Sequence, residues 1–396
     1  MADIAVVHLL RSLVPSSAAT SLGPSATLQI HTSLAQAQAR WRAAQSSCRA
    51  YGFQSYDWLA LWYAHLGQRQ GWQLRLVEVS DADGRVLLFL PLGIQRRRGL
   101  CVLDFLGGEV TDYYAPLLSA DFPVGLFAQL WPAILKLMQV DLFRARRMPQ
   151  TIEGLPNPMT LLAGMRATEQ AHVATLTPSF SVFQQSRSAK MFADTRRQLR
   201  RLQALGAVQL LIDTAPPQRA AVVATMAQQK NRRWRESGGR EMFNEPGYLD
   251  FYQSLARQGL GGGAVVVSGL YVDSQLVATH WGIRYGERFY WLMPGYEDGE
   301  WARYSVGRIL LDAVLQDCIA RGDKLFDLTV GDEAYKKQWA DHTLALYAGQ
   351  QGCSLRGSLA VTLSNLWQAV YAGARGNLRL RNLVRRLRGR APLTPD

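Results

Sequence analysis

The stretch RFYWLMPGYEDGEWARYSVGR, residues 288–308, joins a strand pattern to the start of a helix. Its aromatic beginning favours a β-strand, and helical periodicity starts near Ser305. A helix start offers unpaired N–H groups and the positive end of the helix dipole, which together bind phosphate. Gly307 allows close backbone approach, and Arg303 and Arg308 have the planar donors that grip a diphosphate. The alternative is that Ser305 only caps the helix and both arginines are solvated.

A second informative stretch is LFDLTVGDEAYKKQWADH, residues 325–342, which follows that helix. Asp327 lies in the middle of a buried-type strand, where a carboxylate is costly unless it is paired or functional. Tyr335 and Lys336 come just after the strand, where a phenol could serve acid chemistry and an ammonium could hold an anion. The alternative is that Asp327 pairs with a neighbouring arginine for structure.

The pattern around these stretches occurs twice along the chain. Helical segments precede a meander of three strand patterns, and a helix closes the pattern, first over residues 34–142. The same order recurs over residues 188–330, where a strand follows the helix, and residues 144–166 have room for the matching strand of the first unit. We therefore predict an α/β protein of two tandem units, each with a mixed, mostly antiparallel sheet flanked by helices. The predicted divisions are a flexible leader (1–26), a first unit (27–165), a second unit (166–352) and a basic amphipathic tail (353–396).

Further candidate binding residues lie outside the two stretches. The loop GGEVTDYYAP at residues 107–116 is acidic and aromatic, as in pockets for polar ligands, and contains Asp112 and Tyr113; a purely structural turn is the alternative. A basic helix over residues 187–201 carries Arg197, and the run KNRRWRESGGR from Lys230 looks able to close over a substrate. The simpler interpretation of the basic helix is a solvated face. His280 lies within a strand pattern and is also a candidate, for which a core or edge position is the simpler interpretation.

Composition limits the classes of protein that remain. The 396 residues carry a net charge of +13, and 38 of the 44 cations are arginine, which suits phosphate or carboxylate binding but also follows from codon usage. The four cysteines are isolated, so no zinc-type cluster is predicted, and we expect reduced thiols in a cytoplasmic protein. With no signal-peptide pattern and no run of 18 apolar residues, we expect at most peripheral contact with the inner face of a membrane.

The end of the chain is basic. Residues 375–390 contain seven arginines and no acid, with leucines and a valine at helical spacing. This pattern predicts an amphipathic helix that rests on anionic lipid. The alternatives are a basic tail without a partner and, less favoured because residues 375–396 lack aromatic side chains, a nucleic-acid contact.

Taken together, these pieces resemble the CelD/BcsL group of bacterial acyltransferases in the GNAT superfamily, which are similar to the tandem-GNAT FemAB peptidoglycan aminoacyltransferases. The resemblance spans roughly residues 50–345. It rests on five pieces in order: Pro91-Leu92 with RRRG at 96–99, FLG at 105–107 with Thr111-Asp112-Tyr113, the basic helix at 196–202, Ser305-Val306-Gly307, and Phe326-Asp327 with GDEAYK at 331–336.

The resemblance implies two GNAT-like domains and an acyl-CoA donor such as acetyl-CoA, with no metal. It places the donor's pantetheine along the strand that contains Trp291 and its pyrophosphate at Tyr304, Ser305, Val306, Gly307 and Arg308. Tyr304 and Ile309 depart from the usual residues of that loop. Acyl transfer needs a base, an oxyanion site and an acid. We predict Asp327 as the base, the backbone near Trp291 as the oxyanion site, Tyr335 as the acid, and Lys336 as a stabiliser of negative charge. Predicted acceptor-binding residues are Asp112, Tyr113, Arg197, Lys230 and His280.

Three functions fit this sequence. The leading one is an N- or O-acyltransferase that acts on a small-molecule or lipid-linked saccharide or peptide precursor of the cell envelope or an exopolysaccharide. The second is an aminoacyl-tRNA-dependent transferase, which would make use of the net positive charge. The third is a non-catalytic scaffold subunit of a polysaccharide assembly, docked to membrane by its basic tail.

Overall fold

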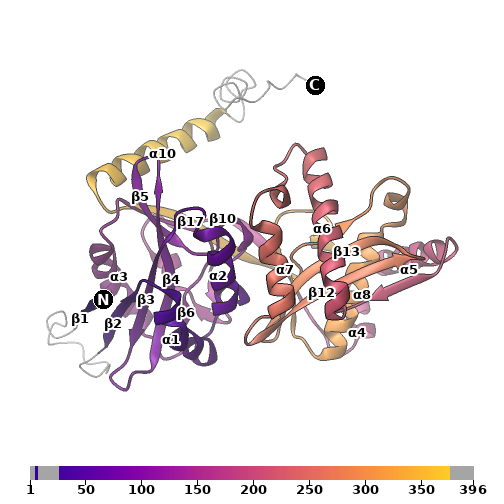
Figure 1. Ribbon diagram of the computed structural model, residues 1–396, viewed down its shortest axis with the longest axis horizontal. Helices are drawn as coiled ribbons and strands as arrows, with labels where there is room; N and C mark the ends of the chain where they lie inside the picture. The colour runs from indigo at the N-terminus through magenta and orange to yellow at the C-terminus, as the bar shows by residue number, and fades with distance from the viewer. Residues whose placement is uncertain (1–4, 8–25, 375–396) are drawn as a thin grey trace.

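The computed structural model describes residues 5–7 and 26–374. Two α/β halves lie side by side, the first drawn in indigo to magenta and the second in pink to orange (Figure 1). The predicted amphipathic helix over residues 375–390 and most of the predicted leader lie outside the described residues.

The N-terminal half holds the following elements: β1 (Ala5–Val7), β2 (Thr27–His31), α1 (Leu34–Ser47), η1 (Gly52–Gln54), α2 (Tyr56–Trp62), η2 (Tyr63–Gly67), β3 (Gln73–Ser80), β4 (Val86–Arg97), β5 (Leu100–Phe105), η3 (Gly108–Val110), β6 (Leu117–Leu118), α3 (Val124–Met138), β7 (Leu142–Pro149), β8 (Thr151–Ile152), β9 (Leu155–Pro156) and η4 (Pro158–Leu161). Strand β1, which lies in the predicted leader, pairs with β2, which follows the leader.

The C-terminal half continues with β10 (Arg166–Thr175), α4 (Phe180–Gln185), α5 (Ala189–Gln203), β11 (Val208–Leu211), α6 (Pro216–Glu236), η5 (Met242–Asn244), α7 (Tyr248–Gln258), β12 (Gly263–Val272), β13 (Gln275–Tyr285), β14 (Arg288–Tyr290), β15 (Gly295–Tyr296), η6 (Gly299–Tyr304), α8 (Val306–Arg321), β16 (Leu325–Val330), α9 (Lys336–Trp339), β17 (His342–Gly352) and α10 (Leu355–Ala374). The run from Lys230, predicted to close over a substrate, is helical through Glu236, and its Arg232 pairs with Glu297 at 2.5 Å.

The predicted repeat is present in the connectivity. In the first half β4 and β5 are antiparallel, α3 follows, and β7 returns parallel to β5. In the second half β13 and β14 are antiparallel, α8 follows, and β16 returns parallel to β14. Both crossover helices begin with Val-Gly, at Val124-Gly125 and at Val306-Gly307. The fold is therefore two similar units with mixed, mostly antiparallel sheets and flanking helices.

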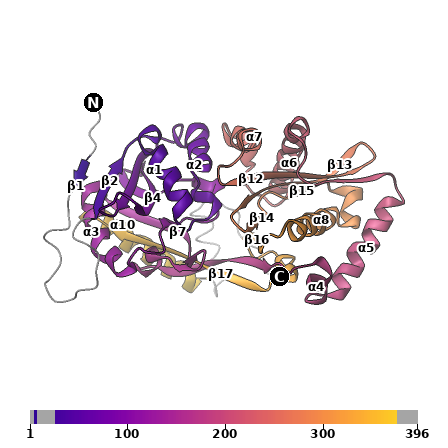
Figure 2. The same ribbon diagram turned by 90° about the horizontal axis from the view of Figure 1, so that it is seen from below.

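The last strand joins the halves into one sheet. β17 pairs antiparallel with β7 of the first half and with β10 of the second half. The strand order is β1-β2-β3-β4-β5-β7-β17-β10-β16-β14-β13-β12-β11, and Figure 2 shows β17 running between the halves. β17 of the C-terminal half thus links the strands of the two halves into one continuous sheet.

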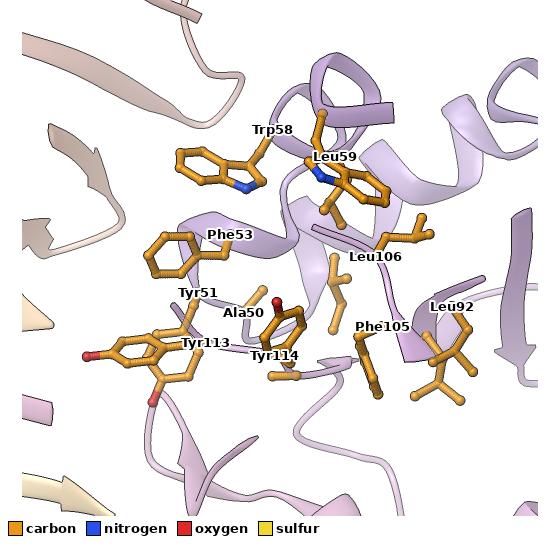
Figure 3. Packing of buried hydrophobic residues seen from close by; sticks show 14 of the residues in the cluster. Ala50, Tyr51, Phe53, Trp58, Leu59, Leu92, Phe105, Leu106, Tyr113 and Tyr114 are labelled. Atoms are coloured by element: carbon orange, nitrogen blue, oxygen red, sulfur yellow. The ribbon is translucent and has the colours of Figure 1, made fainter. Parts of the chain in front are cut away.

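Aromatic side chains from both halves pack against each other in the core. Phe53 contacts Tyr290 with ring centroids 5.3 Å apart, and Trp58 contacts Phe251 at 5.1 Å. Phe53 and Trp58 are fully buried, and Figure 3 shows them beside Tyr113 in the first half. Buried aromatic contacts of this kind favour a fixed arrangement of the two halves.

A buried polar network crosses the same boundary. The Asp327 carboxylate accepts hydrogen bonds from the Tyr113 hydroxyl (2.7 Å), the Arg288 guanidinium (2.9 Å) and the Thr329 N–H (2.8 Å). Arg288 also pairs with Glu153 of the first half at 2.9 Å. Burial alone would lower the pKa of Arg288, but the Asp327 carboxylate raises it well above its ordinary value.

We expect Asp327→Ala to lower the free energy of unfolding by roughly 3–5 kcal/mol, because it leaves a buried guanidinium short of its partner. Tyr113→Phe removes a single hydrogen bond and should cost about 1 kcal/mol. Urea denaturation of both variants measures these losses. An Asp327→Ala protein as stable as the Tyr113→Phe protein would contradict the assigned role of this carboxylate.

Candidate functional site

A cavity of about 440 Å³ opens where β14 and β16 part. The Trp291 N–H donates to the Asp327 carbonyl oxygen at 2.8 Å, which is the last bond towards β16. The chain then stays beside β13, where the Met293 N–H donates to the Trp281 carbonyl oxygen at 2.9 Å. The strand expected at the aromatic beginning of residues 288–308 therefore ends at Tyr290. The cavity is lined by Arg233, Trp291, Pro294, Tyr296, Asp298, Ala302, Ser305, Val306, Gly307, Arg308, Leu311, Tyr335 and Trp339.

One wall of the cavity is the first turn of α8. Ser305 has a left-handed backbone (φ 53°), and its side chain accepts no hydrogen bond from the helix, so its hydroxyl does not cap the turn. The first N–H groups of a helix have no intrahelical acceptor, and the helix dipole is positive here. A Cβ atom on Gly307 would lie 3.1 Å from the Tyr296 ring, so glycine keeps this wall open. The turn offers the features that bind phosphate.

Two further lining side chains, Trp291 and Tyr335, carry polar groups. The Trp291 side chain is 2% exposed, and its indole N–H has no acceptor of good geometry. Burial raises the pKa of the Tyr335 phenol above its ordinary value, Glu333 raises it further, and a polar contact with Trp291 opposes the rise. The phenol is therefore protonated at neutral pH. An indole N–H and a phenol at one cavity suit an acceptor atom on a bound molecule.

His280 forms the layer behind Trp291. The two rings stack with centroids 3.9 Å apart and an interplanar angle of 7°. His280 is fully buried, and neither ring nitrogen has a hydrogen-bond partner. Burial lowers the pKa of the imidazole to about 3, so the ring is neutral and packs as an aromatic plate. This geometry places His280 in the core rather than in contact with the cavity.

The predicted catalytic residues Asp327 and Lys336 do not line the cavity. Asp327 is fully buried with three donors on its carboxylate, which is the arrangement expected of a structural pair. The Lys336 ammonium donates to the Val330 carbonyl at 2.6 Å and pairs with Glu333 at 3.0 Å. Between them, Thr329 has a left-handed backbone (φ 58°), which is strained for a β-branched residue.

A second polar cluster forms between the halves, next to the cavity. It brings together Asp112, Lys230 and Glu333, which are far apart in sequence. Burial raises the pKa of Asp112 although Arg147 lies 3.3 Å away. Burial and the charge of Arg233 lower the pKa of Lys230 to about 8. Since Arg233 also lines the cavity, the cluster and the cavity are neighbours.

A larger basic cavity of about 930 Å³ lies on the other side of Arg308. Its charged lining residues are Lys190, Asp194, Arg197, Arg200, Arg308 and Lys337. Asp194 pairs with both Arg197 and Arg308. The second pair fixes Arg308, the arginine that lines both cavities. The basic helix that was a candidate ligand site, α5, supplies most of this lining.

Three other candidate residues point elsewhere. The Arg303 side chain is exposed and lies over the Tyr304 ring at 5.0 Å, and Tyr304, the last residue of η6, is buried. Neither residue lines the cavity. Tyr113 faces Asp327.

The sequence did not single out Arg233 and Tyr296 as lining residues. The available signals were the cations after Lys230 and the turn Pro294-Gly295.

Comparison with known proteins agrees with this geometry. Residues 189–337 match the family model described as an acetyltransferase (GNAT) domain. None of the curated proteins matches the chain significantly. Among solved structures, the chain is similar to FemX, with a TM-score of 0.54 at 10% identity over 80% of this chain and 96% of that chain.

Two further structures share the fold. One is the C-terminal domain of an Agrobacterium fabrum protein assigned as a lysylphosphatidylglycerol synthetase (TM-score 0.51, 15% identity, covering 84% of this chain and 97% of that chain). The other is a protein of unknown function from Bacteroides thetaiotaomicron (TM-score 0.50, 12% identity, covering 81% and 99%). At these identities the likeness concerns the fold. With the family match it supports the GNAT superfamily and an acyltransferase.

No helix among the described residues is long and apolar enough to cross a membrane. No group of three or more metal-ligating side chains occurs within residues 26–374.

The buried His280 predicts an acid-sensitive stability. The folded imidazole stays neutral down to a pKa of about 3, whereas the unfolded imidazole takes up a proton below about pH 6.5. The contribution of His280 to the free energy of unfolding is therefore fully present above about pH 6.5 and is lost as the pH drops towards 3. At pH 5 the loss from this group is about 2 kcal/mol. The variant His280→Phe should show that much less loss between pH 7 and pH 5 in urea denaturation. Equal pH slopes for the two proteins would show that His280 is protonated in the fold.

Proposed function

We propose that the protein is a GNAT-type acyltransferase that moves an acyl group from acyl-CoA to an amine or a hydroxyl. The observation that carries the proposal is the cavity between the parted strands. It joins a helix start suited to phosphate with an indole N–H that has no acceptor of good geometry and a protonated phenol. A thioester with a diphosphate arm has an acceptor oxygen, a sulfur and phosphates that match these three features.

The two cavities suggest how the donor would lie. Its acyl end fits between Trp291 and Tyr335, and its diphosphate fits at the Val306 and Gly307 N–H groups. Arg308, which is held by Asp194 and lines both cavities, would contact the phosphates. The remaining anionic part of the donor would enter the basic cavity, where five cations face a single carboxylate.

The chemistry follows from the groups around the cavity. The Trp291 indole N–H would donate to the thioester oxygen as negative charge develops there. Tyr335 would give its proton to the leaving sulfur as the carbon–sulfur bond breaks. The acceptor's nitrogen or oxygen forms the new bond and loses a proton. Lys230, with a pKa of about 8, is the group of the adjacent cluster that can take it up near neutral pH. Asp327 would contribute by holding β16 in place.

The acceptor would approach from the cluster between the halves. Asp112 and Glu333 offer carboxylates to a polar acceptor, and the resemblance to CelD/BcsL proteins supports a saccharide or peptide precursor of the cell envelope or an exopolysaccharide.

A second candidate is transfer from aminoacyl-tRNA, which the volume and positive charge of the basic cavity favour. The two donors are separated by equilibrium binding of the wild-type protein. The acyl-CoA proposal expects acetyl-CoA to bind, and the alternative expects aminoacyl-tRNA to bind in its place.

Gly307→Asp should abolish binding of acetyl-CoA, because it adds a carboxylate to the phosphate turn and a side chain that points at Tyr296. Isothermal titration calorimetry measures the affinity. Gly125→Asp is the matched control: Gly125 is the second residue of α3, as Gly307 is of α8, and a Cβ there meets nothing within 4 Å. Unchanged acetyl-CoA affinity in a folded Gly307→Asp protein would refute the assigned donor site.

Tyr335→Phe should lower turnover by roughly 10²–10⁴-fold while the affinity for acetyl-CoA stays near that of the wild type, because it removes only the proton donor. Turnover is followed as release of free CoA thiol in the presence of an acceptor. A variant with wild-type turnover would exclude Tyr335 as the acid, and one with equally lost donor binding would make it a binding residue.

A further inference from the structure

Helix α10 presents an apolar stripe to solvent. The side chains of Leu355, Leu359, Leu363, Leu366 and Trp367 are between 40% and 92% exposed. Their spacing of four, four, three and one residues keeps them on one face of the helix. Proteins in solution rarely leave so many large apolar side chains together, and such patches mark contact sites for a partner or a membrane.

The opposite face of α10 fixes the helix to the protein. Gly357 is buried, and a Cβ there would lie 1.6 Å from the Asp141 carbonyl oxygen, so the helix backbone rests directly on that segment. The Ser354 hydroxyl donates to the Asp141 carboxylate at 2.7 Å. Since its N-terminal turn is fixed in this way, the leucine face points away from the sheet. Figure 1 shows α10 at the outer edge of the molecule.

Positive charge lies beside this stripe. The Arg356 guanidinium donates to the Gly99 carbonyl at 3.0 Å, so the β4–β5 hairpin turn adjoins the start of α10. That turn carries Arg96, Arg97 and Arg98, all exposed. No acid occurs in the sequence between Asp341 and Asp396, whereas residues 375–390, which follow the helix, contain seven arginines.

We propose that the leucine face of α10 and the β4–β5 arginine turn form one surface that docks on an anionic lipid bilayer. Large apolar side chains on one helix face with flanking cations are the features of interfacial helices, which lie in the headgroup region. Trp367 suits that region because its ring is apolar and its N–H is polar. Each arginine near the surface adds attraction that falls away within a Debye length of about 10 Å.

A second copy of the chain suits this surface less well. Two-fold pairing of leucine stripes would bring the same patch together from both copies, and with it two sets of like-charged arginines. A bilayer of anionic lipid supplies an apolar layer and negative headgroups at once. This inference goes beyond the proposed acyl transfer, and it holds or fails independently of the donor.

The test is flotation of the full-length protein with vesicles of mixed phosphatidylglycerol and phosphatidylcholine, and with vesicles of phosphatidylcholine alone. Wild type should float with the anionic vesicles and stay behind with the neutral ones. Leu359→Glu with Leu363→Glu should weaken binding by roughly tenfold or more, because it removes apolar contact and adds negative charge. Arg96→Gln with Arg98→Gln should also weaken binding and should reduce its dependence on salt.

The matched control is Leu161→Glu with Leu205→Glu, two leucines that are 71% and 50% exposed elsewhere. It should float like wild type. Equal unfolding temperatures establish that the α10 variant is folded. The proposal is wrong if wild type ignores anionic vesicles, or if the α10 variant floats as wild type does. It is also wrong if light scattering shows a dimer that only the α10 substitutions convert to a monomer, without lipid binding.

Discussion

The pairing of β17 with strands of both halves is the constraint on which the structure depends. Backbone hydrogen bonds along β7–β17–β10 make a single sheet of what would otherwise be two. The buried carboxylate of Asp327 then ties Tyr113 of one half to Arg288 of the other. With the halves fixed, Asp112 and Lys230 come from different halves into one polar cluster beside the cavity. The proposed acceptor site therefore depends on the fixed arrangement of the two halves.

The two halves repeat the same connectivity but differ at the place where their parallel strands end. In the second half, Trp291, Tyr335 and the start of α8 surround an open volume. In the first half, the corresponding region holds an ion pair at 2.5 Å between the buried Asp104 and the half-buried Arg144, and Trp131 of α3 packs edge-on against Phe143. The first half thus supplies one wall of the polar cluster, while the open volume beside the parted strands lies in the second half.

Local sequence patterns predicted the repeat and the α8 helix, whose end at Gly322 follows from a left-handed residue (φ 84°). They also singled out Trp291, Gly307 and Tyr335, which the structure brings to one cavity. They could not show that β17 crosses between halves, because strand partners depend on contacts far apart in sequence. For the same reason, the sequence could not show which side chains pair with the Asp327 carboxylate. Arg303 and Tyr304, which belong to the turn η6, do not line this cavity.

We propose that an acyl-CoA donor lies between the parted ends of β14 and β16, and a crystal structure of the protein with bound CoA is the decisive measurement. We expect the thiol end between Trp291 and Tyr335, the diphosphate on the N–H groups of Val306 and Gly307, and the nucleotide next to Arg308 in the basic cavity. CoA bound elsewhere on the protein, or a cavity that stays empty at saturating CoA, would contradict it.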